Sequence, residues 1–179
     1  MFSKYMKLGA MIAGILFCGF ALLHNILSSG FIYSLTVTFG TFFYHLAMRL
    51  LVGYTFDRVM KNKADLGKKH YRLAPFEQKL YRKLNVKRWK AGMPTYDPEL
   101  FDPQKHSYEE IAMAMCQAEL VHEAIIVLSF VPLLFSLFAG SFSVFLATSV
   151  LSAMFDGMFV IMQRFNRPRI IALINKKRK

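Results

Sequence analysis

Hydrophobic residues in this chain gather in four long blocks instead of recurring at the period of a surface helix or strand. About 20 consecutive apolar residues are enough to cross the hydrocarbon core as a helix. The pattern predicts four transmembrane helices, over residues of about 8–28, 31–54, 108–139 and 142–165. The turns between the first pair and between the second pair are short and uncharged. The predicted fold is therefore an all-α integral membrane protein, residues 1–179 forming a single membrane domain of two tight helical hairpins.

Local signals refine these helices. The first 30 residues resemble a signal peptide but lack an Ala-x-Ala cleavage site, so a retained first helix is expected. Ser107 followed by Glu110 predicts a capping box that opens the third helix. Pro132 is expected to kink this helix, which is longer than a bilayer needs. The fourth helix is expected to end at Phe165, before a short tail.

The segment 55–107 is polar and rich in Lys and Arg. Within it, Pro75 suits the first position of a short helix. Phe76, Leu80 and Leu84 then share one face, which predicts an amphipathic helix lying in the membrane interface. Trp89, the single tryptophan, suits the level of the lipid headgroups.

Composition and charge indicate the location of the protein and the partners to expect. The chain is 55% hydrophobic yet carries a formal net charge of +12. Basic residues lie at the N-terminus, in the loop 55–107 and in the tail 170–179, whereas the hairpin tips carry no Lys or Arg. The positive-inside rule then predicts a multi-pass cell-membrane protein with both termini and the loop in the cytoplasm. Anionic lipid headgroups or a phosphorylated substrate are the expected partners, and nucleic acid is not, because no basic face stands apart from the membrane segments.

Ionisable residues gather in the cytoplasmic half of the predicted spans, where they are costly unless they serve a function. At a rise of about 1.5 Å per residue, His45 and Asp156 each lie roughly 13 Å inside their helix ends. Arg49 shares a helix face with His45, and Glu119 shares one with His122. The cytoplasmic end of the fourth span adds Arg164, Asn166, Arg167 and Arg169.

These residue types fit acyl transfer. A histidine beside a carboxylate can act as general base on a hydroxyl, while arginines bind phosphates or stabilise an oxyanion. Other interpretations stay open: structural ion pairs inside the bundle, snorkelling of Arg49, or proton-coupled transport. Glu119-x-x-His122 could be half of a carboxylate metal site, but no second copy occurs, so no metal is predicted. Cys116 could carry an acyl group or be an ordinary buried residue.

Three motifs resemble those of the glycosyl-4,4'-diaponeurosporenoate acyltransferases, small bacterial membrane enzymes of carotenoid glycolipid synthesis. They are Arg88-Trp89-Lys90, Ala118-Glu119-Leu120-Val121-His122 and Gln163-Arg164-Phe165-Asn166-Arg167-Pro168-Arg169. The resemblance covers residues of about 84–171, with Phe165 as an aromatic variant. It implies a transferase that esterifies a sugar hydroxyl of a membrane lipid with a fatty acyl group. His45 and Arg49 lie outside it, and the prediction of their roles rests on their depth in the membrane alone.

The sequence thus predicts a membrane O-acyltransferase that acts on a lipid or glycolipid hydroxyl at the cytoplasmic face. His122 is the expected general base, Glu119 its orienting carboxylate, and His45 the second candidate for the base. The expected groups that bind the donor's phosphates or the oxyanion are Arg49, Arg88, Arg164, Arg167 and Arg169, with Asn166 positioning substrate or backbone. The expected donor is acyl-CoA or acyl carrier protein, with no tightly bound cofactor.

Two rival functions stay open at this point. One is another membrane-embedded lipid-modifying transferase, for example a methyltransferase, although the chain shows no nucleotide-binding pattern. The other is a non-enzymatic lipid-binding or transport protein, although four spans are few for a transporter and no inverted repeat is visible. The acceptor lipid and the oligomeric state are left open as well.

Overall fold

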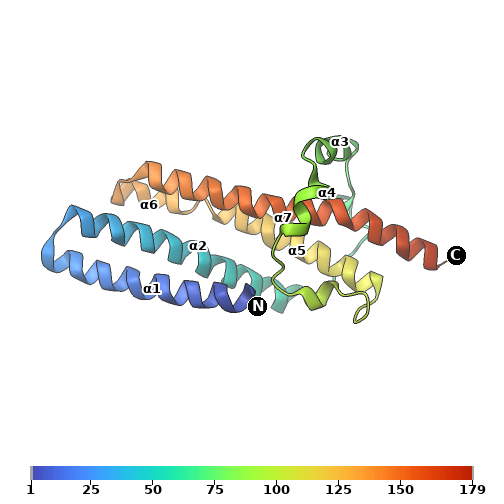
Figure 1. Ribbon diagram of the computed structural model, residues 1–179, viewed down its shortest axis with the longest axis horizontal. Coiled ribbons are helices and arrows are strands. Elements are labelled where there is room, and N and C mark those ends of the chain that lie inside the picture. Colours follow the sequence, from blue (N-terminus) through green and yellow to red (C-terminus); the bar gives the residue numbers. More distant parts are fainter. Residues whose placement is uncertain (1, 179) are drawn as a thin grey trace. The chain divides into compact units, whose positions relative to one another are not determined.

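The computed structural model describes residues 2–178, so Met1 and Lys179, the last residue of the predicted basic tail, lie outside the described residues. The described chain is helical and contains no strand. The helices of its apolar stretches are α1 (Phe2–Leu27), α2 (Gly30–Met60), α5 (Tyr108–Leu128), α6 (Pro132–Ala139) and α7 (Phe142–Lys177) (Figure 1). Short elements fill the loop: η1 (Lys69–Tyr71), α3 (Pro75–Lys83), α4 (Val86–Trp89), η2 (Lys90–Gly92) and η3 (Pro98–Phe101).

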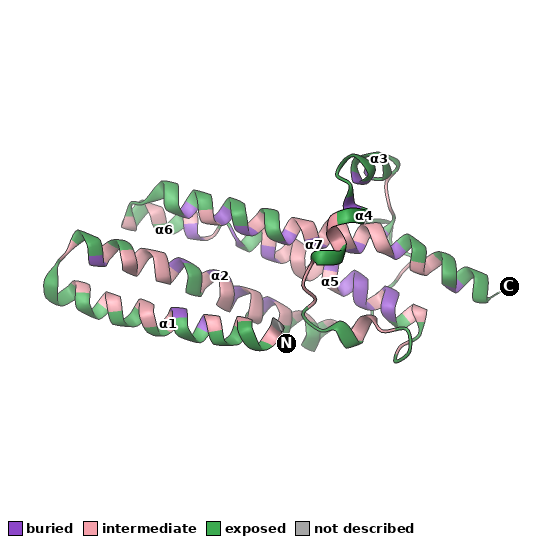
Figure 2. Cartoon of the chain, viewed as in Figure 1, coloured by how far each residue is buried: buried purple, intermediate pink, exposed green. Residues whose placement is uncertain are grey.

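Four stretches are long and apolar enough to cross a membrane: Ser3–Leu27, Gly30–Met60, Tyr108–Ala139 and Phe142–Lys177. They carry many exposed large apolar side chains; Phe138, for example, is 90% exposed and Leu137 is 79% exposed. Figure 2 shows this exposure as green along the long helices. Apolar surface of this extent suits contact with lipid. The predicted all-α fold with four membrane helices is confirmed.

The chain forms two compact units. The hairpin unit consists of the chain up to Gly53 together with Ile125–Met154. In it, α1 and α2 form a hairpin in which the rings of Phe20 and Phe39 stack at 5.4 Å. The contact is close at Gly40, where an added Cβ would lie 2.9 Å from the ring of Phe17. A side chain at this position would therefore force the Phe17 ring or the helices to shift.

The predicted kink in the third span is a complete break. Helix α5 ends at Leu128 and α6 begins at Pro132, which lacks the N–H that an unbroken helix requires. The buried hydroxyl of Ser129 lies in this break and donates to the carbonyl of Ile125 at 2.8 Å. Ser129 and Ser152 hydroxyls also lie 2.8 Å apart, so the break is hydrogen-bonded to α7.

The loop unit consists of Tyr54–Ala124 together with the chain from Phe155 onward. Here the expected end of the fourth helix at Phe165 is wrong, because α7 continues through Pro168 to Lys177. The predicted tail is consequently helical, and its Ile174 is only 5% exposed. Packing of α7 residues on both sides of Pro168 outweighs the backbone hydrogen bond that a proline removes.

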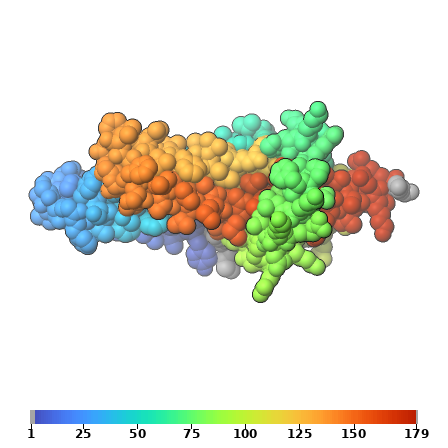
Figure 3. All heavy atoms as spheres, turned by 90° about the horizontal axis from the view of Figure 1, so that it is seen from above, coloured from blue at the N-terminus to red at the C-terminus, as the bar shows by residue number. Residues whose placement is uncertain are grey.

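The expected short helix is present as α3, whose buried face carries Glu77 and Tyr81. Phe76, Leu80 and Leu84 lie on its exposed side, at 68%, 41% and 44% exposure. The predicted capping box is confirmed too: Ser107 and Glu110 each donate a backbone N–H to the other's side chain. Figure 3 shows the segment that contains α3 and α4 lying against the C-terminal part of α7.

Candidate active site

Glu119 on α5 is the centre of a buried ion network in the loop unit. Its side chain is fully buried, and each carboxylate oxygen accepts from a guanidinium. Arg164 Nη1 donates to one oxygen at 2.5 Å, and Arg167 Nη1 donates to the other. A second carboxylate, that of Glu77, also binds Arg164. Two carboxylates and two guanidiniums balance in charge, which is the condition for burying such groups.

Arg164 has no donor left for a ligand. A guanidinium offers five N–H groups. Nε and Nη2 bind the two oxygens of Glu77 at 2.6 and 2.9 Å. Nη1 binds Glu119 and the carbonyl of His70, and Nη2 also donates to the carbonyl of Arg72. Arg164 therefore fastens the loop to α7, and the prediction that it binds the donor's phosphates or an oxyanion stays a prediction.

Arg167 is likewise held by the protein. The residue is 1% exposed, and besides Glu119 it binds the carbonyl of Tyr71 at 2.6 Å and the sulfur of Cys116 at 3.7 Å. Its guanidinium also lies 5.1 Å from the centre of the Tyr71 ring. Arg167 is thus held by groups of the protein itself, and the prediction that it binds substrate stays a prediction.

Glu77, the outer member of the network, has a strongly altered acidity. Burial by itself would raise its pKa. Hydrogen bonds from Arg164, the Ala74 amide and the Tyr81 hydroxyl outweigh this effect and lower the pKa from 4.5 to about 2. Glu77 is thus ionised in the folded protein, as the ion pair requires.

His122 is oriented by Asp156, not by Glu119 as the sequence suggested. His122 Nδ1 lies 2.8 Å from Oδ1 of Asp156, whose side chain is 1% exposed. Both oxygens of Glu119 instead accept from arginines. A carboxylate only accepts hydrogen bonds, so Nδ1 carries the proton and Nε2 is left as a base.

The imidazole plane of His122 is fixed from its face as well. The ring stacks on Phe159 with centroids 4.5 Å apart and an interplanar angle of 6°. Phe155 packs edge-on against Phe159 at 5.1 Å. The His122 side chain nevertheless remains 21% exposed, so its ring is oriented without being closed off. This combination is what a general base needs.

A second histidine, His70 of η1, approaches the other side of the network. Its Nε2 lies 3.1 Å from Glu123 and 3.6 Å from Glu119. The three residues place potential metal ligands within 4.8 Å of one another. Two guanidiniums already bind Glu119, however, and their charge would oppose a divalent cation there. The arrangement therefore favours a hydrogen-bonded histidine over a metal centre, and the prediction of no metal stays a prediction.

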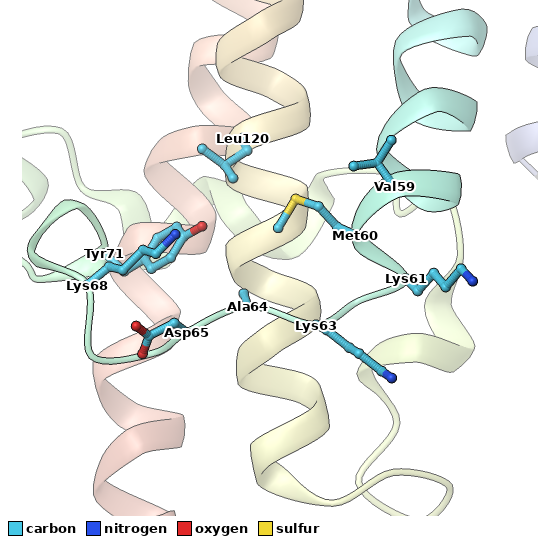
Figure 4. Close-up of a pocket in the computed structure, with 9 residues that line it drawn as sticks. All are labelled: Val59, Met60, Lys61, Lys63, Ala64, Asp65, Lys68, Tyr71 and Leu120. Atoms are coloured by element: carbon cyan, nitrogen blue, oxygen red, sulfur yellow. The ribbon is translucent and has the colours of Figure 1, made fainter.

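An open pocket of about 550 Å³ lies beside the network. Val59, Met60 and Leu120 supply apolar lining, and Tyr71 connects the pocket to Arg167. Its remaining lining residues are Lys61, Lys63, Ala64, Asp65 and Lys68. In Figure 4, Met60 extends from α2 toward α5, whereas the ammonium groups of Lys61 and Lys63 point away. The pocket thus combines an apolar wall with a basic rim.

The remaining predicted residues of α7 lie on a different face of the helix. Arg164 and Arg167 are three residues apart and point to the ion network, while Asn166 and Arg169 share another stripe. Asn166 Oδ1 accepts from the ammonium of Lys90. Arg169 is exposed and lies 4.5 Å from the centre of the Phe165 ring. Arg88 is exposed on α4.

His45 and Arg49 belong to the hairpin unit. Arg49 donates to the carbonyl of His45 at 3.0 Å and to the hydroxyl of Ser152 at 2.8 Å. His45 is 7% exposed. The shared face of these two residues is therefore present, and their proposed parts in catalysis and binding stay predictions.

Sequence reasoning missed three contributors. Glu77 lies on the predicted interfacial helix without a functional signal, His70 belongs to no motif, and Lys90 enters only as part of the motif Arg88-Trp89-Lys90. The apolar stripe of α3 did carry a usable signal: because Phe76, Leu80 and Leu84 occupy one side, Glu77 must lie on another side of α3. No local sequence signal indicates that this side of α3 is buried.

Four apolar helices and an oriented histidine within a polar centre define a multi-pass membrane protein with a candidate active site. A family model described as glycosyl-4,4'-diaponeurosporenoate acyltransferase matches residues 67–176, which include His70, Glu77, His122 and Asp156. The chain belongs to this family, and its general class is membrane acyltransferase. A search of the curated proteins and a search of the solved structures each gave no match.

Proposed function

We propose that this protein transfers a fatty acyl group from an acyl thioester to a hydroxyl of a membrane glycolipid, with His122 as general base. The observation that carries the proposal is the 2.8 Å contact between His122 Nδ1 and the buried Asp156. It fixes the tautomer that exposes a basic Nε2, and the carboxylate stabilises the imidazolium that forms after proton transfer. The stack on Phe159 fixes the ring plane.

The reaction follows from this geometry. Nε2 of His122 takes the proton of the acceptor hydroxyl as its oxygen attacks the thioester carbonyl carbon. The resulting tetrahedral intermediate collapses as the carbon–sulfur bond breaks. The leaving thiolate takes the proton from the imidazolium, which restores His122 and releases a free thiol. The products are one ester and one thiol, and no oxidant or metal takes part.

Donor and acceptor reach the site from different phases. The acyl-CoA or acyl carrier protein is proposed to approach from the cytoplasm. The basic loop and tail predict that this end of the spans faces the cytoplasm. The acceptor is proposed to enter from the bilayer, and the family name supports a glycolipid, with a carotenoid glycolipid as the particular example. The exposed apolar stripe of α3 supports a loop that rests on the lipid surface.

The proposal is tested by an acyl-transfer assay on membranes containing the protein, supplied with radiolabelled acyl-CoA and a glycolipid fraction. Esterified lipid is separated by thin-layer chromatography and identified by its release under mild alkali. His122→Ala is expected to lower turnover roughly 10²- to 10⁴-fold. His106→Ala is the matched control, because His106 is a loop histidine near Glu110 and outside the candidate site.

His45→Ala completes the set as the second candidate for the base. Full activity of His122→Ala with loss in His45→Ala would assign the base to His45 instead. Unchanged turnover in both variants would overturn the histidine mechanism. If the wild type labels no lipid with either acyl-CoA or acyl carrier protein as donor, the non-enzymatic alternative is favoured.

A further inference from the structure

Within the described part of the chain, a group of cations on the loop unit has no acidic partner. The Lys90 ammonium lies 5.0 Å from the centre of the Phe165 ring, and the Arg169 guanidinium lies 4.5 Å from the same centre. The Lys90 ammonium also contacts the side-chain oxygen of Asn166. We call Lys90, Phe165, Asn166 and Arg169 the cationic platform. It unites the ends of two motifs that are 76 residues apart.

The charges of the platform are not neutralised. Across residues 2–178, no ion pair involves Lys87, Lys90 or Arg169. Burial, the charge of Arg169 and the charge of Lys87 together lower the pKa of Lys90. Arg164 and Arg167, from the same motif, are by contrast balanced by carboxylates. Like charges gathered in this way raise the free energy of the protein unless an anion joins them.

We propose that the cationic platform is a phosphate-binding site, which takes the phosphate or diphosphate group of a phosphate ester. Its donors suit that chemistry. The guanidinium of Arg169 can donate to two phosphate oxygens at once. The Lys90 ammonium has two further hydrogens besides the one that it donates to Asn166. The side-chain nitrogen of Asn166 adds two neutral donors. The Phe165 ring holds both cations by cation–π contact. The two side chains are therefore already positioned before a ligand binds.

The same phosphate chemistry could come from two sources. One is a soluble phosphate ester, such as the diphosphate of a coenzyme-type acyl donor. The other is the headgroup phosphate of an anionic lipid in the bilayer. Both sources fit a cationic surface next to membrane helices. The platform is a separate set of residues from the His122–Asp156 pair, so this proposal stands or falls independently of the proposed acyl transfer.

The test is equilibrium dialysis of radiolabelled pyrophosphate against the purified protein in a sugar-based, phosphate-free detergent. The wild type is expected to bind the label saturably, with an affinity that weakens as salt rises. K90Q/R169Q is expected to bind at least about tenfold more weakly, because both charge-assisted contacts are lost. K79Q/R82Q on α3 removes the same charge from exposed positions and is expected to bind like the wild type.

Adding phosphatidylglycerol to the micelles distinguishes the two sources. If the lipid displaces pyrophosphate and shifts the emission of Trp89, which is next to Lys90, the site is assigned to a headgroup phosphate. If pyrophosphate stays bound, the site is assigned to a soluble ester. Trp89 is the single tryptophan, so its fluorescence reports on this location directly.

The proposal is overturned if the wild type binds no pyrophosphate and its Trp89 emission does not respond to the lipid. It is also overturned if K90Q/R169Q and K79Q/R82Q lose affinity equally, since binding would then follow net charge alone. R169K, which keeps the charge, checks that any loss in K90Q/R169Q reflects the site and not folding. His122→Ala should keep full pyrophosphate binding even if acyl transfer fails.

Discussion

Nδ1 of His122 lies 2.8 Å from Oδ1 of Asp156, although 34 residues separate them along the chain. Asp156 is almost fully buried, so its charge interacts with the imidazole with little screening by water. The contact also leaves Glu119 to the two arginines of the ion network. The two carboxylates of this region consequently have different roles, which substitution can separate.

Asp156→Asn is expected to lower kcat of acyl transfer roughly 10²- to 10⁴-fold with little change in KM for either substrate. The amide has nearly the size of the carboxylate but cannot stabilise the imidazolium, and its nitrogen can hold the ring in the wrong tautomer. Initial rates over a range of donor and acceptor concentrations separate kcat from KM.

Asp102→Asn is the matched control for Asp156→Asn, because Asp102 lies in the loop and accepts from the Gln104 amide. It is expected to keep wild-type kinetics. A rise in KM at unchanged kcat in Asp156→Asn would show that Asp156 shapes substrate binding, and the base mechanism would lose its support.

Glu119→Gln is expected to lower the free energy of unfolding by about 3–5 kcal/mol, because it leaves two guanidiniums buried with one carboxylate. The measurement is chemical or thermal unfolding in detergent, followed by helical circular dichroism. Glu99→Gln, which removes a carboxylate from an exposed pair with Lys105, is expected to change stability by less than about 1 kcal/mol.

The double variant E119Q/R167Q tests whether the cost comes from unbalanced charge. Removing one charge of each sign restores balance, so the double variant should be more stable than the sum of its single variants predicts. Strict additivity of the two substitutions would contradict the ion network as described.

Glu77→Gln is expected to destabilise the protein at neutral pH and to be nearly neutral in strong acid. The folded-state pKa of Glu77 is lowered from 4.5 to about 2. Its stabilising effect, on the order of 3 kcal/mol, is therefore complete above about pH 4.5 and is lost as the pH falls toward 2. Unfolding free energies of the wild type and the variant, measured from pH 7 down to 2, should converge in that window.

Glu123→Gln serves as the control for this pH series, since the Glu123 side chain is 34% exposed and pairs with His70. Its effect is expected to be small at every pH. A gap between Glu77→Gln and the wild type that stays constant down to pH 2 would mean that the side chain acts by packing and not by its charge.

The exposed side of α3 is expected to rest on lipid. Replacing Phe76 and Leu80 by Ser should weaken the quenching of Trp89 fluorescence by brominated lipids, because the loop then loses its apolar contact with the bilayer. Tyr96→Ser, an exposed aromatic position of the same loop, is the matched control. Equal quenching in all three proteins would show that α3 is not in the interface.

Much of the fold could be predicted from the pattern of apolar residues alone. A span must be a continuous apolar helix because the hydrocarbon core offers its backbone no other hydrogen-bond partner. The position of the break in the third span followed from Pro132, and the start of α5 followed from Ser107 and Glu110. These are local rules, so they need no knowledge of distant contacts.

The end of α7 shows where local rules fail. Asn166, Arg167 and Pro168 together predict a helix end, yet the helix continues to Lys177. Arg167 is bound to Glu119 and to the Tyr71 carbonyl, and Ile174 is buried. These contacts come from other elements and outweigh the preference of the proline.

The site divides in the same way. The sequence by itself determined that this is a helical membrane protein, that charged residues gather near one end of its spans, and that its motifs resemble those of an acyltransferase family. Only the tertiary structure decided that Asp156 and not Glu119 contacts His122, and that Arg164 and Arg167 pair with carboxylates while Arg169 is exposed. Helical spacing places a residue on a face, whereas the partner that fills each hydrogen bond is set by which helices and loops meet that face.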